Sequence, residues 1–164
     1  MTTEPVREEP LLAVEGLTKH FTTSASGLGR KRAATVRAVE DVSFEVRAGE
    51  TLGLVGESGC GKSTTARLIV RLLEATAGRV VFDGIDISRL SRRAVRPLRR
   101  DIQMIFQDPY GSLNPRHTVG QIVGAPFAIH GTPGDKKENV RDLMDRVGLN
   151  PEHYNRYPHE FSGG

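Results

Sequence analysis

Several features are scarce in this chain of 164 residues, and each scarcity excludes a class of protein. A single cysteine, Cys60, excludes a disulfide framework and suits a reducing compartment. No apolar run approaches the ~20 residues that a bilayer-spanning helix needs. Residues 1–10 are polar and acidic, unlike a secretory signal peptide, and we expect them to be disordered. The sequence predicts a cytoplasmic chain that reaches a membrane only through a partner.

The chain also lacks a large excess of charge of one sign. It has 23 lysines and arginines against 20 aspartates and glutamates, so its charge does not indicate nucleic acid as the main partner. One local cluster of arginines has helical spacing, and we expect it to be a solvated helix face. Its members are Arg92, Arg93, Arg96, Arg99 and Arg100.

The most informative segment is residues 56–63, Gly-Glu-Ser-Gly-Cys-Gly-Lys-Ser, which fits the phosphate-binding loop pattern G-x-x-x-x-G-K-[ST]. A short apolar run at 51–55 precedes it, and residues 62–73 follow with helical periodicity. The order of strand, glycine loop and helix is the order that this loop requires. It predicts an α/β protein with a P-loop NTPase core that binds a nucleoside triphosphate.

Each position of this loop has a physical role. Gly56, Gly59 and Gly61 permit backbone angles and close approach that a Cβ would prevent, so successive N–H groups can face phosphate oxygens at a helix N-terminus. Lys62 can reach the β- and γ-phosphates, and the Ser63 hydroxyl can bind Mg²⁺. The expected cofactors are therefore ATP and Mg²⁺.

Hydrophobic patterns predict the remaining elements. We expect strands at 11–15, 17–21, 36–46, 51–55, 78–84 and 101–106, and helices at 62–73, 88–100, 119–130 and 135–147. Residues 22–35 are predicted to be a flexible hairpin tip or insertion. The chain then divides into an αβ core with a β subdomain at 11–106, and a loop with a helical subdomain at 107–164.

Two further segments select among P-loop proteins. Residues 106–116, Phe-Gln-Asp-Pro-Tyr-Gly-Ser-Leu-Asn-Pro-Arg, resemble the Q-loop of ABC transporter ATP-binding subunits in its peptide-importer form. Residues 156–164, Arg-Tyr-Pro-His-Glu-Phe-Ser-Gly-Gly, resemble the approach to that family's signature. The chain therefore resembles the ATP-binding subunit of a dipeptide or oligopeptide importer. The resemblance implies a partial P-loop NTPase core with an N-terminal antiparallel β subdomain and a partial α-helical subdomain.

The resemblance also implies residue roles. Phe21 would stack on adenine, and Lys62 and Gln107 would be the catalytic residues, Gln107 by completing the Mg²⁺ shell begun at Ser63 and sensing the γ-phosphate. Ser162, Gly163 and Gly164 would close over ATP held by the opposite subunit. The implied nucleotide-binding residues are Phe21, Gly56, Ser58, Gly59, Cys60, Gly61, Lys62, Ser63, Thr64, Gln107, Ser162, Gly163 and Gly164.

The same resemblance implies partners and a location. Transmembrane permease subunits would contact the loop of Gln107, a second ATP-binding subunit would complete a homo- or heterodimer, and a solute-binding protein would act indirectly. The chain would lie peripherally on the cytoplasmic face of the plasma or inner membrane. Dipeptide, oligopeptide, nickel and glutathione importers share these motifs, so the transported substrate stays open.

Two aspartates imitate a Mg²⁺ ligand. Asp83 ends an apolar strand but comes too soon after the P-loop helix, with Gly84 where a catalytic Glu is needed, so we expect a turn residue. Asp108 is assigned to the Q-loop because Pro109 follows it. A small nucleotide kinase using either aspartate, and a binding-only fragment, are the alternative functions. His159 does not begin a zinc motif, since the second histidine of H-E-x-x-H is missing.

The chain ends at Gly164, inside the expected signature. In the family it resembles, the Mg²⁺-binding Asp, the general-base Glu and the switch His come later, so we expect a fragment of an open reading frame that binds ATP weakly without transporter-like turnover. The missing strands would lie between 51–55 and 101–106. We therefore expect both of these strands to expose apolar edges.

Overall fold

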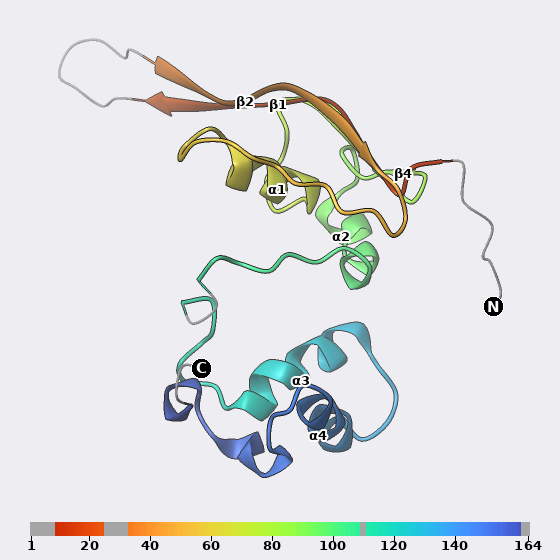
Figure 1. The fold of residues 1–164 in the computed structure, drawn as a ribbon, viewed down its shortest axis with the longest axis vertical. Coiled ribbons are helices and arrows are strands. Elements are labelled where there is room, and N and C mark those ends of the chain that lie inside the picture. Colours follow the sequence, from red (N-terminus) through yellow and green to blue (C-terminus); the bar gives the residue numbers. More distant parts are fainter. Residues whose placement is uncertain (1–8, 25–32, 109–110, 162–164) are drawn as a thin grey trace. The chain divides into compact units, whose positions relative to one another are not determined.

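The computed structural model describes residues 9–24, 33–108 and 111–161. The chain forms two compact units, residues 1–104 and 105–164, and each is treated by itself (Figure 1). The first unit contains the sheet and the P-loop, and the second is helical. No helix in these described ranges is long and apolar enough to cross a membrane.

One antiparallel sheet organises the first unit. Its strands are β1 (Leu12–Ser24), β2 (Ala33–Val46), β3 (Ala77–Phe82) and β4 (Ile85–Asp86). They lie in the order β2-β1-β3-β4, and each neighbouring pair is antiparallel. This sheet is the antiparallel β subdomain expected from the sequence.

The hairpin of β1 and β2 is longer than predicted. The expected strands at 11–15 and 17–21 form one strand, and its ladder continues through Thr22↔Thr35 to Ser24↔Ala33. The ends of the predicted flexible segment 22–35 are therefore strand, while 25–32 lie outside the described residues. Register shifts after Val14, Leu17 and Lys19 mark bulges that let the strand bend without ending.

The β3–β4 connection confirms the expected Asp-Gly turn. Asp83 and Gly84 have φ of 47° and 77°, and Phe82 pairs with Ile85 across them. Two consecutive residues with positive φ in a two-residue hairpin loop are typical of a type I′ turn, which favours Asp-Gly. Asp83 is thus a turn residue.

The P-loop helix is shorter than predicted. Helix α1 spans Lys62–Ile69, because Arg71 adopts a left-handed φ of 54° instead of continuing it to residue 73. The Arg71 side chain explains the early end: its Nε and Nη2 donate to the carbonyls of Ile87 and Leu90 at 2.9 and 2.8 Å. These bonds hold the chain after α1 against the segment after β4.

The predicted helix 88–100 is also interrupted. It consists of a short α2 (Arg92–Val95) capped by Ser91 and a 3-10 helix η1 (Pro97–Arg100). Pro97 causes the break, since its ring disfavours helical geometry in the preceding turn. The arginine cluster therefore does not lie on one continuous helix face.

Two predicted strands are wrong. Residues 51–55 and 101–106 are not strands, and neither segment pairs with a strand in the described part of the chain. Several of their apolar side chains face solvent, with Val55 92% exposed and Ile105 94% exposed, whereas Ile102 packs against the core. Apolar patterning predicts burial, but a strand also needs neighbours for its N–H and C=O groups. The expectation of strands with exposed apolar edges is therefore wrong in its strands, although apolar side chains of both segments are exposed.

The core of the first unit lies between the sheet, α1 and the segment after β4. Its buried members come from β1, β2, α1, β3 and the residue after β4: Val14, Leu17, Val39, Leu68, Val80, Phe82 and Ile87. Leu68 is the helix residue among them, and it seats α1 on the hairpin (Figure 1). The P-loop helix is thereby fixed to the antiparallel sheet.

The second unit contains helices α3 (Val119–His130) and α4 (Lys136–Arg146) and 3-10 helices η2 (Pro151–Asn155) and η3 (Pro158–Glu160). Both predicted helices are confirmed, and α3 tolerates Pro126. Val140 and Met144 form its buried apolar centre. Gly120 lies so close to the Tyr154 ring that an added Cβ would overlap it, which seats η2 against α3.

Candidate nucleotide site

The P-loop of the first unit is built from tight turns. The Cys60 N–H donates to the Glu57 carbonyl at 3.3 Å, and Gly59 and Gly61 have φ of 85° and 98°. These angles are strained for any residue with a Cβ. Gly61 is the residue immediately before α1, so the loop delivers the chain to the N-terminus of that helix. Free N–H groups at this position attract anions.

The hairpin supports the loop from one side. A Cβ on Gly61 would overlap the backbone oxygen of Ala38 and lie 3.5 Å from Val39 Cγ2. A Cβ on Gly56 would lie 2.6 Å from Cys60 Sγ. Close packing against backbone thus disfavours any side chain at Gly61, whereas at Gly56 the neighbour is the side chain of Cys60. The role of Ala38 was not predicted, because a close approach of backbone to backbone leaves no pattern in a sequence.

Lys62 is folded into the loop. Its Nζ donates to the carbonyl oxygens of Gly56 and Glu57 at 2.7 and 2.5 Å, and lies 3.5 Å from Cys60 Sγ. The ammonium group therefore closes a ring across the glycine turn. A triphosphate that entered the loop would offer this ammonium oxygens with full negative charge, which bind it more strongly than carbonyls do.

The start of α1 is fixed by a residue that the sequence did not single out. Thr65 is buried, its N–H donates to the Gly61 carbonyl at 2.8 Å, and its Oγ1 donates to the same oxygen at 3.1 Å. Ser63 is exposed and Thr64 half-buried, with Ser58 and Cys60 exposed in the loop. The hydroxyl of Ser63 is accessible at the first turn of the helix, as a metal ligand must be.

Phe21 lies on the hairpin that supports the loop. Its ring is 37% exposed, and Lys19 Nζ is 5.1 Å from the ring centroid. Lys19 pairs with Val39, the residue that packs beside Gly61, and Phe21 is two positions further along β1, about 7 Å. One unit therefore contains the aromatic residue and the P-loop.

The remaining expected site residues do not belong to the first unit. Gln107 belongs to the second unit and is exposed. Asp108 Oδ1 accepts the Gly111 N–H at 2.9 Å, so its carboxylate is engaged in a local hydrogen bond. The predicted Ser162, Gly163 and Gly164 lie outside the described residues.

The donors present fit a nucleotide better than a stand-alone metal. Within the described residues, no group of three His, Cys, Asp or Glu side chains could hold a metal ion. A triphosphate, in contrast, would meet an ammonium group, a hydroxyl group and the N-terminus of α1. Mg²⁺ keeps several waters and binds proteins through few ligands plus substrate phosphates, so the Ser63 hydroxyl suits a phosphate-bound ion.

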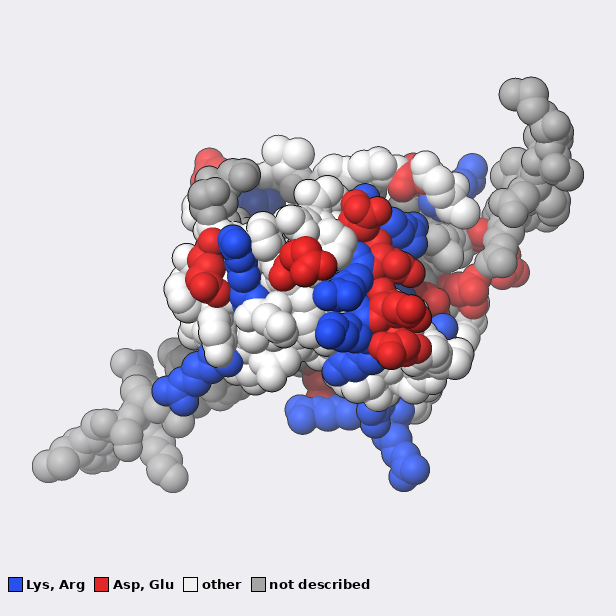
Figure 2. Space-filling model, turned by 90° about the horizontal axis from the view of Figure 1, so that it is seen from below, with Lys and Arg blue, Asp and Glu red and all other residues white. Residues whose placement is uncertain are grey.

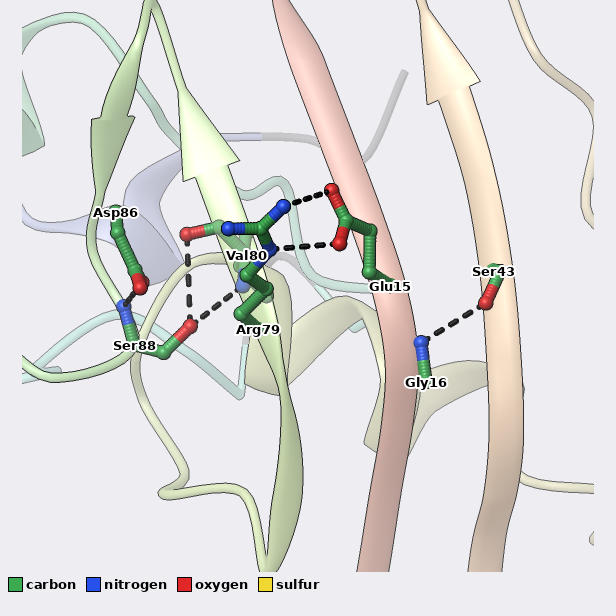
Figure 3. Close-up of polar contacts among 7 residues, drawn as sticks. All are labelled: Glu15, Gly16, Ser43, Arg79, Val80, Asp86 and Ser88. Atoms are coloured by element: carbon green, nitrogen blue, oxygen red, sulfur yellow. Dashed lines mark hydrogen bonds and ion pairs between the residues drawn. The ribbon is translucent and has the colours of Figure 1, made fainter.

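The sheet holds a charged pair across β1 and β3. Arg79 Nε and Nη2 donate to the Glu15 carboxylate at 2.6 and 2.8 Å (Figure 3). This bidentate bond lowers the pKa of Glu15 and raises that of Arg79. Nearby, Ser88 Oγ accepts the Val80 N–H at 2.5 Å and tethers the segment after β4 to β3 (Figure 3).

Acidic and basic side chains lie next to each other on the face that Figure 2 presents. Helix α4 illustrates this mixture, because it carries Lys136, Lys137, Arg141 and Arg146 with Glu138, Asp142 and Asp145. Interspersed charges of both signs keep a surface soluble without creating a strong field of one sign.

Comparison with known proteins places the chain in one family. The ABC transporter family profile matches residues 39–164. The chain is 53% identical over 160 residues to the oligopeptide transport ATP-binding protein OppF of Bacillus subtilis, covering 95% of this chain and 50% of that protein. It is 53% identical over 161 residues to the glutathione import ATP-binding protein GsiA of Salmonella choleraesuis, covering 97% of this chain and 26% of that protein. The chain thus spans half or less of these relatives.

Solved structures agree with the fold. The chain superimposes on the dimeric post-hydrolysis structure of the ATP-binding cassette MJ0796 bound to ADP and Pi, with a TM-score of 0.74 and 24% identity, covering 92% of this chain and 63% of that one. Another dimeric MJ0796 structure, of a bacterial ABC transporter cassette, gives a TM-score of 0.73 and 26% identity, covering 93% and 63%. The architecture is that of part of such a cassette.

Proposed function

This chain belongs to the ABC transporter family, and from that premise we propose that it is the ATP-binding part of an importer of dipeptides or oligopeptides. The observation that carries the nucleotide assignment is the glycine loop that enters α1 at Gly61 with Lys62 folded across it. The similarity to an oligopeptide transport protein supports the peptide substrate, and the similarity to a glutathione import protein supports a small peptide.

In the proposed site, the loop and the N-terminus of α1 bind the phosphates. Lys62 leaves the carbonyls of Gly56 and Glu57 and contacts the β- and γ-phosphates. Ser63 would contribute a hydroxyl to Mg²⁺, and the bound ion would neutralise phosphate charge. Phe21 stacks on adenine, and its exposed ring on the same hairpin that packs against Gly61 supports this role.

The proposed coupling involves the second unit and other subunits. Gln107 would supply an amide oxygen to Mg²⁺, and its loop would contact a transmembrane permease subunit. Ser162, Gly163 and Gly164 would contact ATP bound by a second ATP-binding subunit. The dimeric state of the similar MJ0796 cassette supports this pairing. Such an assembly would hold the chain at the cytoplasmic face of the membrane, with a solute-binding protein acting indirectly.

The test compares ATP binding by the wild-type chain and the Lys62→Ala variant. We expect the variant to bind ATP about ten- to a hundredfold more weakly, because a charge-assisted contact is worth about 1.5–3 kcal/mol. Isothermal titration calorimetry with Mg²⁺-ATP measures this difference. Arg67→Ala is the matched control, since it removes a positive charge from the exposed side of the same helix and should bind ATP as the wild type does.

Turnover separates the proposal from its alternatives. We expect this 164-residue chain to bind ATP without transporter-like hydrolysis. Unchanged ATP affinity in Lys62→Ala would overturn the P-loop assignment, and Lys62-dependent hydrolysis by the isolated chain would overturn the binding-only expectation. A nucleotide kinase would instead release ADP only when a phosphate acceptor is added.

A further inference from the structure

A cavity in the first unit lies apart from the residues assigned to the nucleotide. It has a volume of about 450 Å³ and is lined by three arginines, Arg71, Arg92 and Arg99, with Leu73 and Val95 among its apolar walls. Cavities of about 300–1,000 Å³ are the size that holds small ligands. Its lining comes from the segment after α1 together with α2 and η1.

Two of these guanidinium groups are held in place by the fold. Arg71 donates to the carbonyls of Ile87 and Leu90 at 2.9 and 2.8 Å, and Arg99 Nη2 donates to the Arg71 carbonyl at 3.3 Å. Both arginines are half-buried. A guanidinium that is already oriented loses less entropy when it binds a ligand.

The positive charge of this cavity is not neutralised by ion pairs. The structure gives Arg71, Arg92 and Arg99 no ion pair with a carboxylate of the described residues, and their bonds go to neutral carbonyls. Glu74 also lines the cavity, so its lining carries three arginines and one acidic residue. Positive charge without an ion pair, next to the apolar side chains of Leu73 and Val95, favours the binding of an anion.

We propose that this cavity binds a phosphoryl group, supplied either by a soluble phosphate compound or by a phospholipid headgroup. A phosphoryl group has three acceptor oxygens and up to two negative charges, which suit binding by arginine side chains. The site is separate from the P-loop, and the inference does not depend on the proposed function.

The test titrates the ¹⁵N-labelled chain with pyrophosphate, following backbone amides and arginine Nε–H signals by NMR. We expect saturable shifts at residues 71–74 and 92–99, distinct from those of the P-loop at 56–63. Arg92→Gln should weaken the response at 92–99 about three- to tenfold, because Arg92 lines the cavity and its side chain forms no hydrogen bond or ion pair with the described residues. The NMR spectrum itself reports whether each variant is folded.

Arg93→Gln is the matched control: it makes the same charge change in the same short helix, but Arg93 does not line the cavity. Its pyrophosphate affinity should stay within about twofold of wild type. Equal weakening of pyrophosphate binding by both variants would overturn the site. The absence of a saturable shift at 92–99 with both pyrophosphate and phosphatidylglycerol vesicles would also overturn it. An equal response to succinate would overturn the preference for phosphate. If Arg92→Gln binds phosphatidylglycerol vesicles more weakly than Arg93→Gln does, but the two variants bind pyrophosphate equally, the ligand is a phospholipid headgroup.

Discussion

At the scale of single residues, two glycines of the P-loop differ in what they avoid. Gly59 and Gly61 both have positive φ, but a Cβ on Gly59 would meet nothing within 4 Å, whereas one on Gly61 would overlap the Ala38 carbonyl oxygen. The first glycine relieves backbone strain alone. Gly61 also permits the loop to contact the hairpin. The two glycines of the motif therefore meet two different physical requirements, backbone strain and close packing.

This difference predicts unequal costs of substitution. Gly59→Ala should lower the free energy of unfolding by about 1–2 kcal/mol through left-handed strain. Gly61→Ala should cost more, because the Ala38 backbone must also move. Urea unfolding followed by circular dichroism measures both, and Gly59→Ala serves as the control for strain. Equal losses would contradict the contact with Ala38.

The Glu15–Arg79 pair makes a prediction about pH. The pKa of Glu15 is lowered by its bond to Arg79, so its contribution to stability is present above the ordinary glutamate pKa and is lost as pH falls through the lower, folded value. Arg79→Gln should raise the Glu15 pKa toward the ordinary range of a glutamate. Carboxyl ¹³C NMR titration measures the pKa, with Arg89→Gln as a control of equal charge. An unchanged titration of Glu15 would contradict the assigned pair.

At the scale of elements, helix α3 shows how caps compensate for a poor interior. Pro126 lies inside the helix and cannot donate to the preceding turn. At the N-terminus, Thr118 and Gln121 form a capping box, with bonds of 3.3 and 2.9 Å. Gly131 ends the helix in the left-handed conformation that favours glycine. Well-formed ends thus help to define a helix whose middle contains a proline.

Removing the cap should destabilise the second unit. Thr118→Ala should cost about 1 kcal/mol, because the Gln121 N–H loses its partner. Amide hydrogen exchange should become faster in α3 while the sheet of the first unit is unaffected. Thr132→Ala, in the exposed loop after α3, is the matched control. Unchanged exchange of α3 in Thr118→Ala would show that the capping box does not stabilise the helix.

At the scale of the whole molecule, apolar exposure is the main feature. Val55 is 92% exposed, Ile105 94% and Phe106 42%, all in segments whose sequences are typical of strands. Exposed β-capable apolar segments are common sites of association. The described residues supply neither segment with a neighbouring strand.

We therefore expect this chain to self-associate through these segments. Val55→Thr combined with Ile105→Thr should reduce binding of the dye ANS and shift sedimentation toward the monomer. Val36→Thr is the control, because Val36 is 53% exposed but lies in the paired strand β2. A double variant that binds ANS and associates as the wild type does would contradict this expectation.

Local features of the sequence determined much of the protein. The G-x-x-x-x-G-K-[ST] spacing identified the loop, the Asp83–Gly84 dipeptide identified a hairpin turn, and apolar periodicity identified α3 and α4. Each of these depends on residues within a few positions of one another, where backbone angles and helical spacing act directly. The nucleotide roles of Phe21 and Gln107 came from family resemblance and stay predictions.

Only the tertiary structure decided the features that depend on residues far apart in the chain. A strand forms when another strand satisfies its backbone groups, so 51–55 and 101–106 could not be judged from their own residues. The end of α1 depends on hydrogen bonds to the carbonyls of Ile87 and Leu90. The close packing of Gly61 depends on the backbone of Ala38. The sequence thus predicts which residues bind phosphate, and the fold decided what holds them in place.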